Sequence, residues 1–132
     1  MSLFRSPEME QKYKEFRESH PVGYTNWNEP DIIIKEWNNW KLVKNIFYWD
    51  ELLILDNLLI PKRQCKDFNN LSSIELKELQ EITNELNAKG NYDSIIANFR
   101  KKRSVLYWFH FHCVEFLKRA KMNDYFQVDI KD

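Results

Sequence analysis

Two histidines at alternate positions are the residues of this sequence best suited to chemistry. His110 and His112 lie in an apolar, aromatic stretch whose composition predicts a β-strand over residues 104–116. Side chains two apart on a strand point to the same face, so both imidazole rings should project together from a rigid platform. Near neutral pH, two imidazoles can supply a nucleophile, a proton donor or two metal ligands.

Each of these uses competes with a simpler interpretation. Both rings could be half-buried and hydrogen-bonded to the backbone or to an aspartate. A zinc site would need a third and usually a fourth ligand. Cys113 is expected on the opposite face of the strand, and His20 and Cys65 lie far away in the sequence. The sequence therefore leads us to assign neither a metal site nor a cofactor.

Two helices are predicted among the elements that must position this pair. The first spans residues 6–19, because Ser6 can cap it and Pro7 suits the first helical position. The second begins with the capping box Ser72-Ser-Ile-Glu75 and ends at Gly90, which is free to adopt the left-handed cap.

The remaining segments predict one sheet. Strands are expected at residues 31–35, 41–46, 52–60, 92–99 and 104–116. The order of elements predicts an α+β fold, an antiparallel sheet of about five strands with one main covering helix and an additional N-terminal helix. We expect a single domain over residues 1–132, with its core at about 31–116. The tail, residues 117–132, is expected to hold a short helix and a further strand.

The composition limits the classes of function. The 20 basic and 20 acidic side chains cancel, which argues against strong sequence-independent binding of nucleic acid. The two glycines are too few for a glycine-rich phosphate loop. No apolar stretch approaches the roughly 20 residues that span a bilayer, so no membrane partner is expected. With no signal peptide and two cysteines without paired spacing, the chain is expected to be cytoplasmic.

Several short motifs between Trp40 and Val114 follow one another in a recognisable order. They are Trp40-Lys-Leu-Val-Lys-Asn45, Leu58-Leu-Ile-Pro-Lys-Arg63, Leu71-Ser-Ser-Ile-Glu-Leu76, Tyr92-Asp-Ser-Ile-Ile-Ala-Asn98 and Arg103-Ser-Val105. In this order the chain resembles the histidine-triad superfamily of nucleotide hydrolases and transferases. The resemblance covers more than half of the chain and implies a histidine-triad-like fold.

In that family a strand carries three alternating histidines, and the middle one attacks the α-phosphate of a nucleotide to form a covalent nucleotidyl-enzyme. In the simplest register, Trp108 stands in this chain where the family has the first of its three histidines. His110 then resembles the nucleophile, and His112 resembles the flanking donor to the phosphate. The family's first position also orients the nucleophilic ring through its backbone carbonyl, which any residue supplies.

The resemblance also implies residues that bind the substrate. Ser104 resembles the residue that holds the leaving group, and Asn98 resembles the asparagine that lines the nucleotide site. Trp108 could stack on the base or fill the core beside the site. Arg103 belongs to a basic turn, residues 100–103, which either attracts phosphate or is a solvated turn.

The chain departs from the family pattern at three places. The first histidine is missing, and Asp56-Asn57 occupies a region where the family often has a histidine. Ser104 precedes His110 by six residues, whereas the family's serine precedes its nucleophile by five. A β-bulge near Leu106–Trp108 would absorb the extra residue, whereas an unbroken strand would give Ser104 another role. A second register would make His112 the middle histidine.

The sequence thus predicts a nucleotide-binding protein that acts on a nucleotide or dinucleotide polyphosphate. It would hydrolyse or transfer at the α-phosphate through a His110 intermediate. The resemblance implies a homodimer. Two alternatives stay open: a catalytically inactive binding module of the same fold, and a protein-interaction domain without a small-molecule site.

Overall fold

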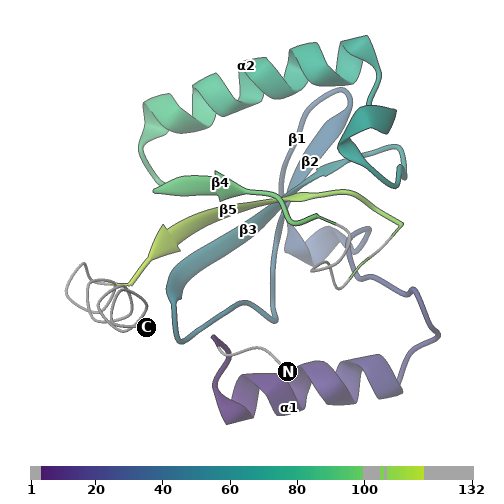
Figure 1. The fold of residues 1–132 in the computed structure, drawn as a ribbon, viewed down its shortest axis with the longest axis vertical. Helices are drawn as coiled ribbons and strands as arrows, with labels where there is room; N and C mark the ends of the chain where they lie inside the picture. Colours follow the sequence, from purple (N-terminus) through teal and green to yellow (C-terminus); the bar gives the residue numbers. More distant parts are fainter. Residues whose placement is uncertain (1–3, 100–104, 106, 118–132) are drawn as a thin grey trace.

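One five-stranded antiparallel sheet and two α-helices make up the fold in a computed structural model, which describes residues 4–99, 105 and 107–117 (Figure 1). The elements are α1 (Pro7–Glu18), β1 (Ile33–Glu36), β2 (Trp40–Lys44), β3 (Leu53–Pro61), α2 (Ser73–Lys89), β4 (Ser94–Ile96) and β5 (Phe111–Phe116). Short 3-10 helices at Pro30–Ile32 and Phe68–Asn70 precede β1 and α2. The predicted α+β class, the antiparallel sheet and the two helices are confirmed.

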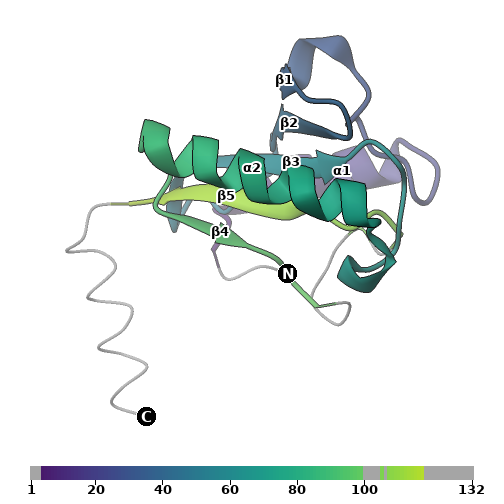
Figure 2. The same cartoon turned by 90° about the horizontal axis from the view of Figure 1, so that it is seen from above.

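The strand order in the sheet is β1-β2-β3-β5-β4, and every neighbouring pair is antiparallel. The long strand β3 is central, because it pairs with β2 on one side and with β5 on the other. Helix α2 covers one face of the sheet, and α1 lies on the opposite side (Figures 1 and 2). The histidine strand is therefore held against the middle of the sheet.

Local capping signals fix both helices. The Ser6 side chain accepts a hydrogen bond from the Met9 amide, and Pro7 opens α1. At α2, the Ser72 hydroxyl accepts from the Glu75 amide and the Glu75 carboxylate accepts from the Ser72 amide, so the predicted capping box is present. Gly90 ends α2 in the left-handed conformation, with φ at 70°.

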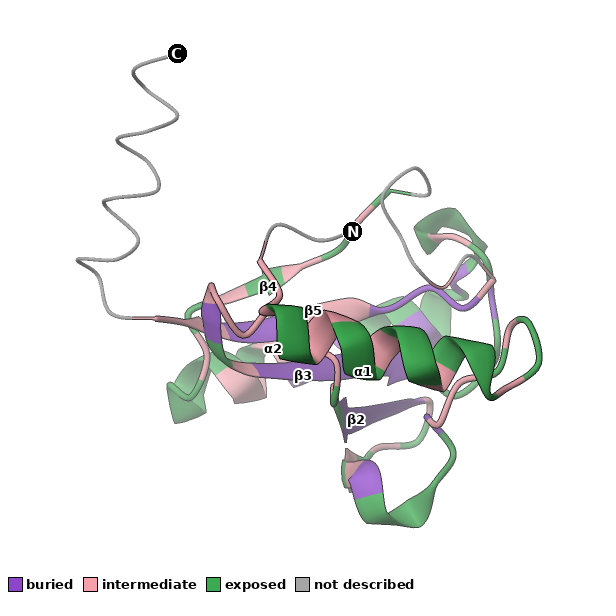
Figure 3. Ribbon diagram, turned by 90° about the horizontal axis from the view of Figure 1, so that it is seen from below, coloured by how far each residue is buried: buried purple, intermediate pink, exposed green. Residues whose placement is uncertain are grey.

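Each face of the sheet has its own apolar cluster, because alternate side chains of a strand point to opposite faces. The cluster beneath α2 contains Trp40, Leu42, Leu59, Cys65, Leu71, Leu79, Ile82, Phe109 and Cys113. The cluster on the opposite face contains Trp27, Ile32, Val43, Leu58, Ile60 and Trp108. Among the described residues, the longest buried runs lie in β2 and β3 (Figure 3).

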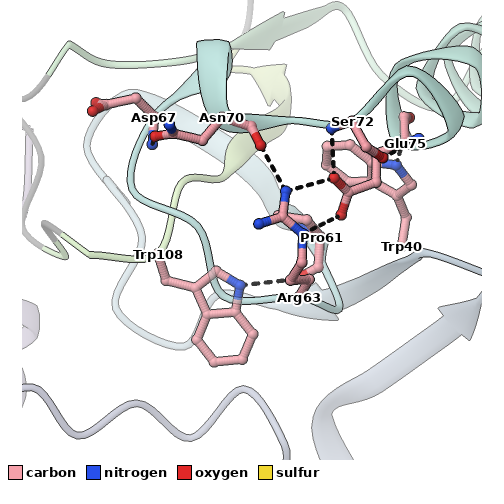
Figure 4. A network of polar contacts seen from close by, with 8 residues as sticks. All are labelled: Trp40, Pro61, Arg63, Asp67, Asn70, Ser72, Glu75 and Trp108. Carbon is pink, nitrogen blue, oxygen red and sulfur yellow. Dashed lines mark hydrogen bonds and ion pairs between the residues drawn. The ribbon is translucent and has the colours of Figure 1, made fainter.

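A polar network joins the end of β3 to the start of α2 (Figure 4). The Arg63 guanidinium donates to the Asn70 carbonyl at 2.6 Å and to the buried Glu75 carboxylate at 2.7 Å. The hydrogen bond from Arg63 holds the pKa of Glu75 below its ordinary value. This pair therefore stabilises the fold above the ordinary carboxyl pKa, and its contribution is lost as the pH falls through the lowered value.

The predicted strand over residues 104–116 is wrong for the described residues that precede Phe111, which are 105 and 107–110. β5 begins at Phe111, and the described residues 107–110 are outside the sheet. They bond instead to the end of β3 and to the segment after it: the Trp108 indole donates to the Pro61 carbonyl, and the Phe109 amide donates to the Cys65 carbonyl. The hypothesis of an unbroken strand therefore fails, and the chain approaches the sheet through an irregular segment.

Other boundaries also differ from the predictions. The predicted strand at residues 31–35 begins later, at Ile33, because Pro30 starts a 3-10 turn. The predicted strand at residues 92–99 contains only the three residues of β4. The helix and strand predicted in the tail, and the basic turn at residues 100–103, lie outside the described residues.

Substituting the two glycines should have unequal effects on stability. Both have positive φ, but a Cβ at Gly23 would overlap the Tyr107 hydroxyl, whereas a Cβ at Gly90 would meet nothing. We expect Gly90→Ala to lower the free energy of unfolding by about 1 kcal/mol and Gly23→Ala by about 2–3 kcal/mol. Urea unfolding of both variants measures this difference. An equal loss would show that the Gly23–Tyr107 contact does not constrain the fold.

Candidate functional site

The two histidine rings lie together on the sheet face opposite α2. His112 pairs with Leu58 of β3 and Ile96 of β4, and His110 immediately precedes β5. Their ring centroids are 5.1 Å apart, with an angle of 61° between the planes. Cys113 belongs to the cluster beneath α2, so it points away from the rings, as predicted. The predicted pair is thus formed, and α2 does not cover it.

The His110 ring is oriented by the backbone of Trp108. Its Nδ1 lies 3.0 Å from the Trp108 carbonyl oxygen. A carbonyl oxygen only accepts, so Nδ1 carries a hydrogen and the lone pair of the neutral ring is on Nε2. The residue is only 5% exposed, and the Trp27 ring lies edge to face with it at 4.9 Å between centroids. Trp27 is therefore part of the wall around His110.

The His112 ring is oriented by a buried carboxylate. Its Nδ1 lies 3.2 Å from both oxygens of Asp56, whose side chain is 2% exposed, whereas the His112 side chain is 18% exposed. Because a carboxylate accepts, this contact places a hydrogen on Nδ1 of His112. The Trp49 ring stacks on the imidazole at 6.2 Å between centroids. The ring is thus held at one nitrogen and along one face.

Asn45 fixes Asp56 in turn. The Asn45 side-chain amide donates to Oδ2 of Asp56 at 2.9 Å. The Asn45 side-chain oxygen accepts from the Phe47 amide at 3.1 Å, which sets the orientation of the Asn45 side chain. A chain of hydrogen bonds therefore runs from the backbone after β2 through Asn45 and Asp56 to His112.

A narrow cavity adjoins His112. Its volume is about 20 Å³, enough for roughly one water molecule. Its lining is mostly apolar and comprises Trp49, Leu52, Leu53, Ile96, Asn98, His112, Val114 and Phe116. The structure thus brings Asn98, which the sequence singled out, to the same cavity as His112. A phosphate group would enter here only after the surrounding side chains had moved.

Trp108 is buried in the cluster opposite α2. The residue is 7% exposed, its indole N–H donates to the Pro61 carbonyl at 2.8 Å, and the Trp27 ring lies 5.3 Å away. This packing favours the core-filling interpretation of Trp108, and a role in stacking on a base stays a prediction. Arg103 and Ser104 lie outside the described residues, so their predicted roles remain predictions.

A buried lysine lies on the same face of the sheet. Lys41 Nζ is 5.3 Å from the Trp108 ring centroid and donates to the side-chain oxygen of Asn28, next to Trp27. Burial lowers the pKa of this amine from its ordinary value. Lys41 therefore fastens the loop that carries Trp27 to the sheet beside His110.

Cys113, on the sheet face beneath α2, should react slowly with thiol reagents. Burial, with a smaller contribution from Asp56, raises the pKa of the Cys113 thiol to about 12. At pH 8 we therefore expect a thiol reagent to react slowly with the native protein. After denaturation it should react rapidly with both cysteines, which are buried in the fold and form no disulfide. Rapid modification of Cys113 in the native protein, located by peptide mapping, would contradict this environment.

Comparison of the chain with protein-family models, with curated proteins and with solved structures gave no match. In the part of the chain that the structure describes, no three His, Cys, Asp or Glu side chains are grouped to hold a metal ion. Over the same residues, no helix has both the length and the apolar character needed to span a bilayer. The case for a function therefore depends on the geometry of the two histidines.

Proposed function

We propose that this chain is a nucleotide-binding protein of the histidine-triad type that cleaves at the α-phosphate of a nucleotide or dinucleotide polyphosphate. One observation carries the proposal: the Trp108 carbonyl accepts from Nδ1 of His110, which puts the lone pair of the neutral ring on Nε2. The replacement of the first triad histidine by Trp108 is compatible with this role, because the contact uses only the backbone.

In the proposed reaction, the Nε2 lone pair of His110 attacks the α-phosphorus. The bond to the leaving group breaks, and its electron pair departs with the leaving group. The charge that develops on the ring is shared with the Trp108 carbonyl through Nδ1–H. Water then attacks the same phosphorus, the P–N bond breaks and a nucleoside monophosphate is released.

In this proposal, His112 donates a hydrogen bond to the phosphate of the ligand. Because Asp56 engages its Nδ1, the other nitrogen, Nε2, is the one that can meet a ligand. When the ring is protonated there, it donates a hydrogen bond to a non-bridging phosphate oxygen. Asn98 lies at the same cavity and is proposed to contact the nucleotide.

The burial of His110 sets a requirement. Because His110 is buried and the Trp27 ring packs against it, a substrate reaches the His110 ring only after neighbouring side chains have moved. The same burial, with the small cavity at His112, supports a second candidate: a binding module of the same fold without turnover. The homodimer belongs to the proposal through the family resemblance alone, and the cytoplasmic location belongs to it through the two cysteines without paired spacing.

A ligand panel tests the proposal. The wild type is mixed with AMP, ADP, an adenosine phosphoramidate and a diadenosine polyphosphate, and its melting temperature and product release are followed. A ligand at 100 times its dissociation constant should stabilise the fold by about 2.7 kcal/mol. Stabilisation with turnover supports the enzyme, and stabilisation without turnover supports the binding module. Neither effect with any nucleotide would reject both and leave a protein-interaction domain.

A further inference from the structure

The carboxylate behind His112 has no counterpart in the motifs that suggested a nucleotide site. Asp56 is buried on the central strand β3, and both of its oxygens face Nδ1 of His112. A carboxylate removed from water needs hydrogen-bond partners, and here His112 and Asn45 supply them. The buried Asp56 carboxylate is therefore held in one orientation by the side chains of Asn45 and His112.

We infer that Asp56 is a positioning residue: it holds one proton of His112 on Nδ1, so that a second proton, on Nε2, makes the ring a cation that donates to the ligand phosphate. The inference that Nε2 meets phosphate rests on the proposed function. The inference about the proton rests on the geometry alone, because two acceptor oxygens 3.2 Å from Nδ1 require a donor there.

Asn45 determines which atom of residue 56 faces His112. Its oxygen is occupied by the Phe47 amide, so its NH₂ group is the part that faces Asp56. In an Asp56→Asn variant, the new side-chain oxygen must still accept from Asn45. The new NH₂ group then faces His112, whose Nδ1 has to become the acceptor. The variant is nearly isosteric, yet it should move the proton of the neutral His112 ring from Nδ1 to Nε2.

Imidazole ¹⁵N NMR measures this proton directly. In the wild type with neutral rings, Nδ1 of His112 should resonate at the protonated end of the nitrogen range, and Nε2 at the unprotonated end. Asp56→Asn should exchange the two signals of His112 and leave those of His110 unchanged. The matched control is Asp50→Asn, which removes a carboxylate bonded to Ser6 and should leave both histidines unchanged.

The wild-type spectrum tests the inference even if Asp56→Asn does not fold, because a neutral His112 ring with its proton on Nε2 would overturn it. Adding Asn45→Ala to Asp56→Asn removes the partner that holds the new amide, so its oxygen can turn to His112. Part of the Nδ1–H signal should then return. An unchanged His112 tautomer in the well-folded single variant would overturn the inference, as would a double variant that shows no return.

Turnover separates this inference from the proposed function. On a nucleotide that the wild type cleaves, Asp56→Asn should lower kcat by about 10- to 100-fold, because the ring then holds its one proton on Nε2 and cannot become the cation that stabilises the phosphate. Asp50→Asn should retain the kcat of the wild type. If the tautomer moves and no substrate is ever cleaved, the proposed function fails and the role of Asp56 in placing the proton stands. If turnover occurs and the tautomer does not move, the role of Asp56 fails alone.

Discussion

His110→Ala should abolish turnover on any nucleotide that the wild type cleaves, lowering kcat by at least about 1,000-fold. The reason is the proposed covalent step, in which the Nε2 lone pair of His110 attacks the α-phosphorus while the Trp108 carbonyl holds Nδ1–H. Nucleotide binding should survive in the variant, since His112, Asp56 and Asn98 are unchanged. A single-turnover assay with a binding measurement separates the two effects.

His20, the remaining histidine of the sequence, provides the matched control. His20 follows α1, its Nδ1 contacts the Phe16 carbonyl at 2.8 Å, and its ring stacks on Tyr24. His20→Ala removes an imidazole without touching the candidate site, so turnover should remain within about twofold of the wild type. If His110→Ala keeps its activity, the nucleophile is another residue.

Trp40→Ala should lower the free energy of unfolding by about 4 kcal/mol, a large part of the 5–15 kcal/mol typical of a domain. Trp40 is fully buried beneath α2, and its indole donates to the Glu75 carbonyl at 2.9 Å. The substitution therefore leaves a large void and a carbonyl without its donor at the start of α2. Urea unfolding of the wild type and the variant gives the difference.

Trp37 is the comparison for this substitution. It lies on the same hairpin but is only partly buried against the cluster beneath α2. Trp37→Ala should cost about 1–2 kcal/mol, because less apolar area returns to water. A cost for Trp40→Ala no greater than that for Trp37→Ala would contradict the packing of the cluster.

The sequence predicted the helices well because their signals are local. Ser6 and Pro7 start α1, and the reciprocal hydrogen bonds of Ser72 and Glu75 start α2, each within one turn of chain. The alternation of His110 and His112 correctly placed both rings on one face. The α+β class followed from the order of elements, although the histidine-triad-like fold itself stays a prediction.

The features that the sequence did not predict depend on contacts between distant residues. The pairing of β3 with β5 puts Asp56 beside His112, across 56 positions of the chain. Trp27 reaches His110 from a loop that has no regular periodicity. The irregular segment before β5 is held by the Cys65 carbonyl, and no composition signal distinguishes it from a strand.

These distant contacts could have been predicted only if the register between β3 and β5 had been known. A weak signal was present in the sequence, because Asp56 and Asn57 are polar residues within an otherwise apolar strand. Polar residues buried in a strand need partners, and both of these have them: Asp56 bonds to His112 and Asn45, and Asn57 donates to the Tyr92 hydroxyl at 2.7 Å. Such interruptions mark positions where a strand makes a specific contact.

The most direct test of the central claim is to trap the nucleotidyl group on the protein. Wild type mixed with an adenosine phosphoramidate is quenched in alkaline denaturant, digested and mapped by mass spectrometry. The account predicts one added nucleoside monophosphate on the peptide that contains His110, attached through Nε2, and no such mass in His110→Ala. Turnover with the group on any other residue, or with none in a single-turnover time course, would contradict it.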